Sequence, residues 1–166
     1  TLNAKAEDIE NSRLYGDSFM HRRCLVLCSG FFEWRKVKNE KIPYYITLKN
    51  DELFVFAGIW NKTTDDRGKT MDSYAILTIE ANELLSQIHN TKCRMPLILS
   101  PEKAKDWLNP GLSQEELGKL IRPLPSTEFK AHTIKKFLPS QSRILNSADI
   151  IAYYNYPHIP DIIIET

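Results

Sequence analysis

The fold is organised around Arg22–Trp34, which reads RRCLVLCSGFFEW. Two cations open this stretch, and the apolar run Cys24–Cys28 that follows has the composition of a β-strand. Ser29 and Gly30 then predict a turn, because both residue types favour turn conformations. The aromatic run Phe31–Val37 predicts a second strand.

Glu33 is the one acid of this stretch, and it is flanked by Phe31, Phe32 and Trp34. A carboxylate in aromatic surroundings is costly to ionise, because desolvation disfavours the charged form. Such a group is suited to proton transfer, so Glu33 is the first candidate catalytic residue. Strand alternation also allows a plainer interpretation, in which Glu33 lies on the solvent face while Phe32 and Trp34 face inward.

Outward from this stretch, runs rich in aromatic and β-branched residues predict further strands at Tyr44–Leu48, Leu53–Trp60 and Ser73–Ile79. Lys49–Glu52 reads as a hairpin turn, and Asn61–Thr70 reads as a polar loop. The first half is therefore predicted to be mainly antiparallel sheet.

Residues 8–21, which precede these strands, are polar and predict only a turn at Gly16-Asp17. The second half of the chain differs from the first, because its patterns predict both helices and strands. We predict an α+β fold, with a mixed, mainly antiparallel, partly closed β-sheet and peripheral helices, in a single domain spanning residues 1–166. The elements expected after the first half are a short helix in Glu80–Ile88, a buried strand at Met95–Leu99, a helix capped by Ser100, a helix that starts with the capping box of Ser113 and Glu116, and a strand at Phe129–Ile134.

Composition limits the function classes. The chain has 22 basic and 21 acidic residues, so any affinity for nucleic acid must come from a local cationic patch. Its 3 cysteines are an odd and sparse set, which favours a reducing compartment over a disulfide scaffold. The sequence shows neither a signal peptide nor an apolar run of membrane-spanning length. We expect a soluble, cytoplasmic monomer that does not bind membranes.

A second candidate site is the segment Ile88–Pro96. His89 follows the predicted short helix, where its imidazole could exchange protons near neutral pH or simply cap the last carbonyl groups. Lys92 and Arg94 add positive charge that could contact phosphate, although a solvated loop has the same composition.

Other chemistry receives less support. His21, Cys24, Cys28 and Cys93 suggest zinc, but Cys24 and Cys28 on one strand would stand about 13 Å apart, too far to share a metal or form a disulfide. A protease that pairs Cys24 or Cys28 with His89 lacks any local nucleophile motif. Thr1 could be an amine-activated nucleophile, but a chain cut at that point explains it as well. We therefore expect buried structural thiols, no metal and no cofactor.

Several motifs, taken in order, resemble the SOS-response-associated peptidase (SRAP) domain family. The resemblance extends to about Leu99 and weakens toward the tail. The motifs that carry it are Asn3–Glu7, Arg22–Val26, Gly30–Trp34, Ala57–Trp60, Leu77–Asn82, Ile88-His89 and Arg94–Pro96.

The resemblance implies an enzyme-like activity on single-stranded DNA that contains abasic sites. In the family, autoproteolytic removal of the initiator Met exposes an N-terminal cysteine, which joins the sugar aldehyde in a thiazolidine crosslink. By position, Asn3 resembles the family's active-site asparagine, Glu33 its acid/base glutamate, and His89 its histidine that assists ring opening and reversal.

The resemblance also implies residues that bind nucleic acid. Lys5 stands where the family usually has arginine, Arg94 matches an arginine that contacts the DNA backbone, and Thr78 is expected nearby. Arg22 and Arg23 would extend this cationic edge, while aromatic side chains could stack on unpaired bases.

The sequence departs from the family pattern at three points. The nucleophilic cysteine is expected upstream of Thr1, so the chain as given is not expected to crosslink DNA. Lys5 lacks the bidentate fork of arginine. The spacing from His89 to Arg94 is longer than the familiar His-x-Arg-Met-Pro. Two alternative functions stay open: a non-catalytic module that binds single-stranded nucleic acid, and a cysteine-type peptidase acting on other proteins.

Overall fold

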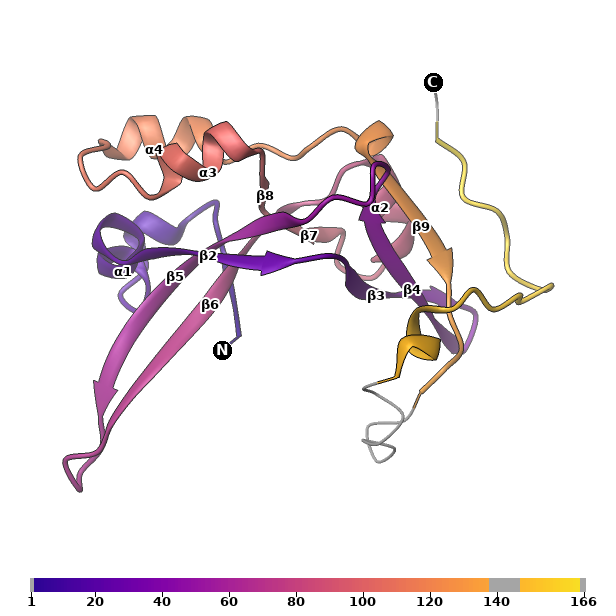
Figure 1. Ribbon diagram of the computed structural model, residues 1–166, viewed down its shortest axis with the longest axis horizontal. Helices are drawn as coiled ribbons and strands as arrows, with labels where there is room; N and C mark the ends of the chain where they lie inside the picture. Colours follow the sequence, from indigo (N-terminus) through magenta and orange to yellow (C-terminus); the bar gives the residue numbers. More distant parts are fainter. Residues whose placement is uncertain (1, 138–146, 165–166) are drawn as a thin grey trace. The chain divides into compact units, whose positions relative to one another are not determined.

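The computed structural model describes residues 2–137 and 147–164 (Figure 1). The α+β class and the mainly antiparallel pairing are confirmed, with the strands distributed over two sheets. Thr1, the suggested nucleophile, lies outside the described residues. The chain divides into two compact units, so the single domain stays a prediction. The first unit comprises Thr1–Cys28, Leu53–Glu80 and Met95–Leu124, and the second comprises Ser29–Glu52, Ala81–Arg94 and Pro125–Thr166.

The sheet of the first unit has the order β1-β6-β5-β2, in which β1 and β6 are parallel and the other two pairs are antiparallel. Two short strands extend it, because β7 pairs with β6 and β8 pairs with β5. The strands are β1 Asn3–Lys5, β2 Arg23–Cys28, β5 Phe54–Thr64, β6 Thr70–Glu80, β7 Arg94–Pro96 and β8 Ile98–Leu99.

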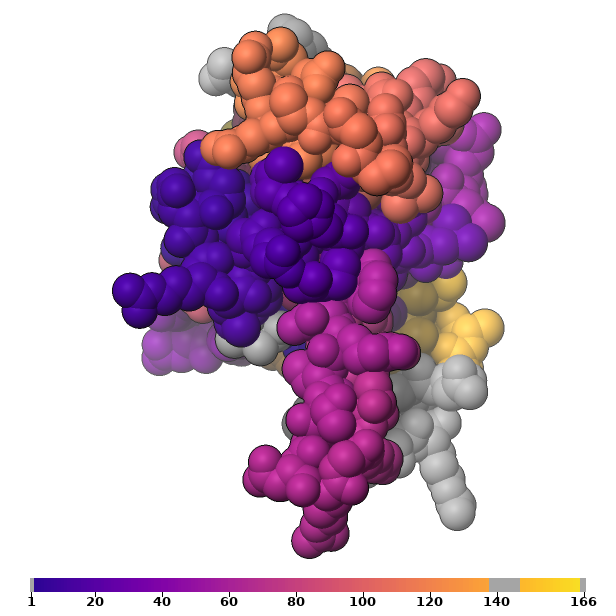
Figure 2. All heavy atoms as spheres, turned by 90° about the vertical axis from the view of Figure 1, so that its left-hand side faces the viewer, coloured from indigo at the N-terminus to yellow at the C-terminus, as the bar shows by residue number. Residues whose placement is uncertain are grey.

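Helices α1 and α3 pack on β2 and β5 (Figures 1 and 2). Trp107 of α3 is fully buried, and its indole N–H lies 3.1 Å from the carbonyl of Cys24 and 3.3 Å from that of Gly58. Phe19 of α1 packs against it with ring centroids 5.8 Å apart. This aromatic pair centres the core between the helices and the sheet. The helical elements of the unit are η1 Ile9–Asn11, α1 Gly16–His21, α3 Pro101–Trp107 and α4 Gln114–Leu120.

The outer half of the β5–β6 hairpin extends beyond β1, β2 and α1 of its unit (Figures 1 and 2). The prediction of a polar loop at Asn61–Thr70 is wrong, since β5 continues to Thr64 and β6 begins at Thr70. Polar residues occupy strand positions there because this part of the ribbon is mostly exposed. The tight turn is closed by the Asp65 carboxylate, which accepts hydrogen bonds from the backbone of Arg67 and Lys69.

The second unit contains a sheet of order β3-β4-β9, entirely antiparallel. Helix α2 contacts β3, and it is capped at its N-terminus by Asn82, whose side chain accepts from the backbone N–H of Leu85. The sheet and helices are β3 Phe31–Val37, β4 Glu40–Leu48, β9 Phe129–Thr133, α2 Glu83–Ile88, η2 Ser126–Glu128 and η3 Ala148–Ile151.

The C-terminal segment 147–164 is bound to three elements of the second unit. At β9, the Thr133 hydroxyl donates to the carbonyl of Tyr154 at 2.6 Å. On β3, the buried guanidinium of Arg35 donates to the carbonyl of Pro160 at 2.6 Å. On α2, the side chain of Gln87 both donates to and accepts from the backbone of Ile163. The segment is thus an integral part of this unit.

Two further predictions are wrong. Lys49–Glu52 does not close a hairpin, because β4 pairs with β3 and β9 whereas β5 lies in the other sheet. A short polar connection fits either outcome, and long-range strand pairing decides between them. Gly16 begins α1 instead of marking a turn; a Cβ there would lie 2.6 Å from the carbonyl oxygen of Glu10, so close packing requires the glycine. The helix caps at Ser100 and Ser113 are confirmed.

Candidate functional site

The structure brings Glu33 and His89 together in the second unit. Glu33 lies in β3 and His89 directly follows α2. The Glu33 Oε2 and His89 Nδ1 atoms are 3.7 Å apart, and each side chain is 21% exposed. A carboxylate and an imidazole at this distance, both partly shielded from water, form a pair able to exchange protons with a bound molecule.

The free edge of β3 holds this pair in place. In the described residues β3 pairs only with β4, so alternate backbone N–H groups at its other edge need side-chain partners. Glu33 Oε1 accepts from the N–H of Trp34 at 2.9 Å. Two residues along, the Asn90 amide accepts from the N–H of Lys36 and donates to its carbonyl, both at 2.9 Å. Asn90 therefore fixes the residue after His89 to the strand that carries Glu33.

The ring of His89 has a defined orientation. Its Nδ1 atom lies 2.9 Å from the carbonyl oxygen of Arg94, which can only accept, so Nδ1 carries the proton of this hydrogen bond. In the neutral ring, Nε2 is then the proton acceptor. Cys93 has a positive φ of 49° and donates its N–H to the carbonyl of His89, and this turn returns Arg94 to the imidazole. The longer spacing between His89 and Arg94 is accommodated by this turn.

A pocket of about 360 Å³ opens beside the pair. Trp34 and Phe137 form an aromatic wall, with ring centroids 6.1 Å apart. Two lysines and Thr91 add polar groups, so the pocket combines acid, imidazole, aromatic and cationic character. Its lining residues are Glu33, Trp34, Lys36, Lys41, His89, Thr91 and Phe137.

Asn3, Lys5 and Thr78 lie in the first unit and share one face of its sheet. Lys5 is opposite Thr78 in the parallel pair of β1 and β6, and Asn3 is two residues away on the same side. Ala4 between them is buried on the other face, and its carbonyl accepts from the Thr78 hydroxyl at 3.3 Å. The side chains of Asn3 and Lys5 are exposed.

Arg22 and Arg23 differ in their surroundings. Arg23 donates to the carbonyl groups of Phe19, Met20, Trp107 and Asn109, and burial lowers the pKa of its guanidinium. These four contacts give Arg23 a structural role in joining α1 and α3, and its predicted contact with DNA stays a prediction.

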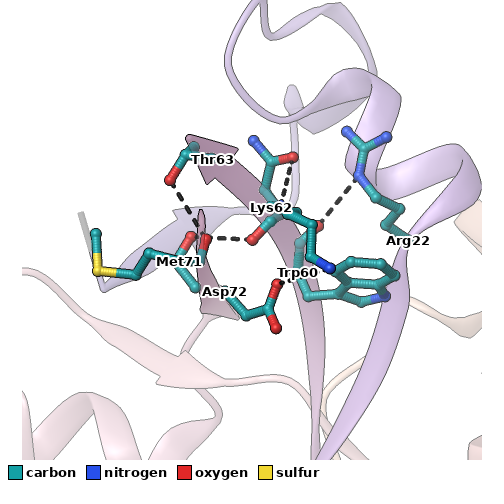
Figure 3. A network of polar contacts seen from close by, with 8 residues as sticks. Arg22, Trp60, Lys62, Thr63, Met71 and Asp72 are labelled. Atoms are coloured by element: carbon teal, nitrogen blue, oxygen red, sulfur yellow. Dashed lines mark hydrogen bonds and ion pairs between the residues drawn. The ribbon is translucent and has the colours of Figure 1, made fainter. Parts of the chain in front are cut away.

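Arg22 lies at the base of the projecting hairpin (Figure 3). Its Nε donates to the carbonyl of Trp60 at 3.3 Å, and its Nη2 lies 2.5 Å from the carboxylate of Asp17. Trp60 is directly opposite Tyr74, and both side chains are exposed. Two pairs further out along the ribbon, Lys62 is opposite Asp72, and their side chains are 3.9 Å apart. A groove of about 660 Å³ runs from Cys24–Leu27 to these hairpin residues.

Comparison with known proteins identifies the family of this chain. The sequence profile of the family "SOS response associated peptidase (SRAP)" matches residues 1–140. The chain belongs to the SRAP family. A SRAP relative from Bacillus subtilis (strain 168), "Abasic site processing protein YoaM", is 32% identical over 93% of this chain and 67% of its own length.

Two further relatives agree. "Abasic site processing protein YedK" from Escherichia coli (strain K12) is 29% identical, over 81% of this chain and 60% of its own length. A solved structure from Bacteroides thetaiotaomicron superposes with a TM-score of 0.86 at 35% identity, covering 93% of this chain and 66% of that one. The chain thus spans about two thirds of the length of these SRAP relatives.

Sequence reasoning missed the parts of the candidate site that depend on strand pairing. The sequence analysis did not single out Asn90, Lys36 or Lys41, because their positions at the candidate site follow from the edge of β3 and from the register between β3 and β4. Trp60 and Tyr74 lie in predicted strands, and Trp60 also belongs to a motif of the family resemblance, but their pairing on an exposed ribbon follows only from the hairpin. The spacing of lysines across a strand pair is the one signal that could have pointed to Lys36 and Lys41.

The described residues, 2–137 and 147–164, contain no group of three or more His, Cys, Asp or Glu side chains arranged to hold a metal ion. Within the same residues, the structure has no helix of the length and apolar character needed to cross a membrane.

The cysteines of this SRAP chain should differ in reactivity. Burial raises the pKa of the Cys28 thiol to about 11 and also raises that of Cys24, whereas Cys93 is exposed. Since the thiolate is the reactive form, iodoacetamide at pH 7.5 should alkylate Cys93 about tenfold faster than Cys28, or more. Peptide mass spectrometry measures the three rates, and the chain unfolded in guanidinium is the control. Equal rates for Cys28 and Cys93 in the folded chain would contradict this assignment and revive a thiol-based role for Cys28.

Proposed function

We propose that the chain is the larger part of a protein that forms a covalent thiazolidine crosslink with abasic sites in single-stranded DNA. The attacking cysteine is the N-terminal residue of the whole protein, exposed by autoproteolysis. The observation that carries the proposal is the pairing of Glu33 with His89 at 3.7 Å beside a pocket, in a chain of the SRAP family. The names of the relatives as abasic site processing proteins support the choice of substrate.

The reaction begins with opening of the abasic sugar, which exists mainly as a ring. A base takes the proton of the anomeric hydroxyl while the ring oxygen gains a proton, and the aldehyde appears at C1′. His89 is suited to this step, because its Nδ1–H is held by the Arg94 carbonyl and its Nε2 is the free acceptor of the neutral ring.

Ring closure onto the protein requires a proton donor. The amine of the N-terminal cysteine adds to C1′, and the hydroxyl formed there leaves as water after it gains a proton. The thiol sulfur then adds to the same carbon and releases its proton, so that one water is lost overall. Glu33 gives and recovers the proton in these steps, since its carboxyl group lies beside His89 and is anchored to the N–H of Trp34.

The DNA strand would be held by separate groups of the two units. Asn3, Lys5 and Thr78 share one sheet face of the first unit, with Asn3 supporting catalysis and Lys5 available to a phosphate. Arg22 and Arg94 extend the cationic contacts, and exposed aromatic side chains such as Trp60 offer surfaces on which unpaired bases stack.

The proposal is tested with the full-length natural protein and single-stranded DNA that carries one abasic site. A slowly migrating band on a denaturing gel is expected, and it should be absent when the N-terminal cysteine is replaced by alanine. DNA with an intact base at the same position is the substrate control. Binding of the DNA without a covalent band would overturn the proposal in favour of a non-catalytic binding module. Cleavage of an unrelated protein that is lost on Glu33→Gln, with no covalent band, would instead indicate a peptidase.

A further inference from the structure

Two lysines lie directly opposite each other in the second unit. Lys36 of β3 and Lys41 of β4 are Cα partners in the antiparallel register, and both line the pocket that contains Glu33 and His89. Like charges in this arrangement repel and destabilise a strand pair. The opposition of Lys36 and Lys41 is therefore expected to be offset by a nearby anion, which is either an acidic side chain of the protein or a bound ligand.

The acid nearest in sequence does not compensate the pair. Glu40, adjacent to Lys41, binds Lys136 with a distance of 2.5 Å between Oε2 and Nζ, and Lys136 holds the pKa of Glu40 below its usual value. His158 lies 3.7 Å from the same oxygen. Within residues 2–137 and 147–164, neither Lys36 nor Lys41 forms an ion pair with a carboxylate. Their two ammonium groups thus remain available at the pocket.

We propose that Lys36 and Lys41 form a phosphate-binding subsite for the nucleotide next to the abasic sugar. The inference rests on the proposed function, and it assigns a place to one phosphate of the DNA strand. Both ammonium groups sit on flexible four-carbon stems, so they can converge on a single phosphate. Trp34 lies between Glu33 and Lys36 in the sequence of β3. Its ring and that of Phe137 form an apolar wall for the sugar or base attached to that phosphate.

The arrangement explains why the lysine pair and the proton-transfer pair occur together. Asn90 binds both backbone groups of Lys36 and directly follows His89, so one residue fixes the positions of the lysine and of the imidazole. A phosphate bound at Lys36 would therefore place the neighbouring sugar at a set distance from Glu33 and His89. The subsite acts in positioning and takes no part in proton transfer.

The first test uses full-length protein and abasic single-stranded DNA in which one phosphate beside the lesion, on either side, is replaced by an uncharged methylphosphonate. For the natural protein, one of the two replacements should weaken binding about fivefold to tenfold at low salt. The Lys36→Ala, Lys41→Ala double variant should bind unmodified DNA with a similar loss, and should no longer distinguish the methylphosphonate from the phosphate. Lys119→Ala with Lys130→Ala is the matched control, because both lysines pair with acids outside the pocket.

The second test separates the subsite from general loss of folding. Lys41→Glu places an acid opposite Lys36, so it should raise Tm by about 1 to 3 °C while it weakens binding of abasic DNA. A variant that merely disturbed the fold would lower both. The crosslinking rate at saturating DNA should change less than the affinity does, since the lysines bind the phosphate and move no proton.

The outcomes separate this inference from the function on which it rests. If the natural protein neither binds nor crosslinks abasic DNA, the proposed function fails. If it does crosslink, but both methylphosphonate substrates bind as tightly as unmodified DNA, the subsite is refuted and the proposed function stands. Sensitivity to methylphosphonate that persists in the double lysine variant would likewise refute the assignment to Lys36 and Lys41.

Discussion

Glu33→Gln in the full-length protein is expected to slow thiazolidine formation by a factor of about 10² to 10⁴, with DNA affinity nearly unchanged. Glutamine keeps the size of the side chain, and its amide oxygen can still accept from the N–H of Trp34. It cannot give a proton to the departing hydroxyl or take one back. The expected result is thus a loss in rate and not in binding.

Single-turnover gels with excess protein measure the rate, and fluorescence anisotropy on DNA with an intact base measures the affinity. Glu52→Gln is the control, because it removes one exposed acid of the same unit outside the pocket. Crosslinking by Glu33→Gln at the natural rate would remove Glu33 from the mechanism.

Trp107→Ala is expected to lower the free energy of unfolding by about 3 to 5 kcal/mol. The substitution empties the space of a fully buried indole, removes its packing against Phe19, and leaves the carbonyl groups of Cys24 and Gly58 without the indole N–H. The guanidinium of Arg23, 5.8 Å from the ring centroid, also loses its aromatic neighbour. Urea unfolding followed by circular dichroism measures the change.

Two variants of the same helix end calibrate this result. Trp107→Phe keeps a ring in the core but lacks the N–H donor, so its loss should be smaller, about 1 to 3 kcal/mol. Leu108→Ala alters a neighbour that is 50% exposed, and should shift stability by about 0.5 kcal/mol or less. An unfolding midpoint for Trp107→Ala equal to that of Leu108→Ala would mean that α3 does not anchor the first unit.

Local sequence patterns predicted the elements whose signals are themselves local. Phe31–Val37 forms the predicted strand, and the capping box of Ser113 and Glu116 forms as predicted. The pairing between strands distant in sequence could not be predicted, because many possible partner strands have the same alternation of side chains. The false hairpin at Lys49–Glu52 is the direct result, since each flanking strand has its partners elsewhere.

The candidate site shows the same division. Glu33 and His89 could be chosen from their neighbours in sequence, and the structure places them in contact distance. The edge contacts of Asn90 and the opposition of Lys36 and Lys41 depend on which strand faces which, and no single segment carries that information. The roles of Asn3, Lys5, Thr78, Arg22, Arg23 and Arg94 toward DNA stay predictions.

The bonds of segment 147–164 have a consequence for protein engineering and for evolution. The family match ends at residue 140, yet Thr133, Arg35 and Gln87 all depend on backbone groups beyond it. A boundary drawn from sequence similarity would therefore leave the buried guanidinium of Arg35 without its carbonyl partner, two residues from Glu33 on the same strand. Because these bonds use the backbone of the segment, its side chains are free to diverge between relatives while its path is retained. Sequence divergence at this end of the chain is thus compatible with a fixed structural role.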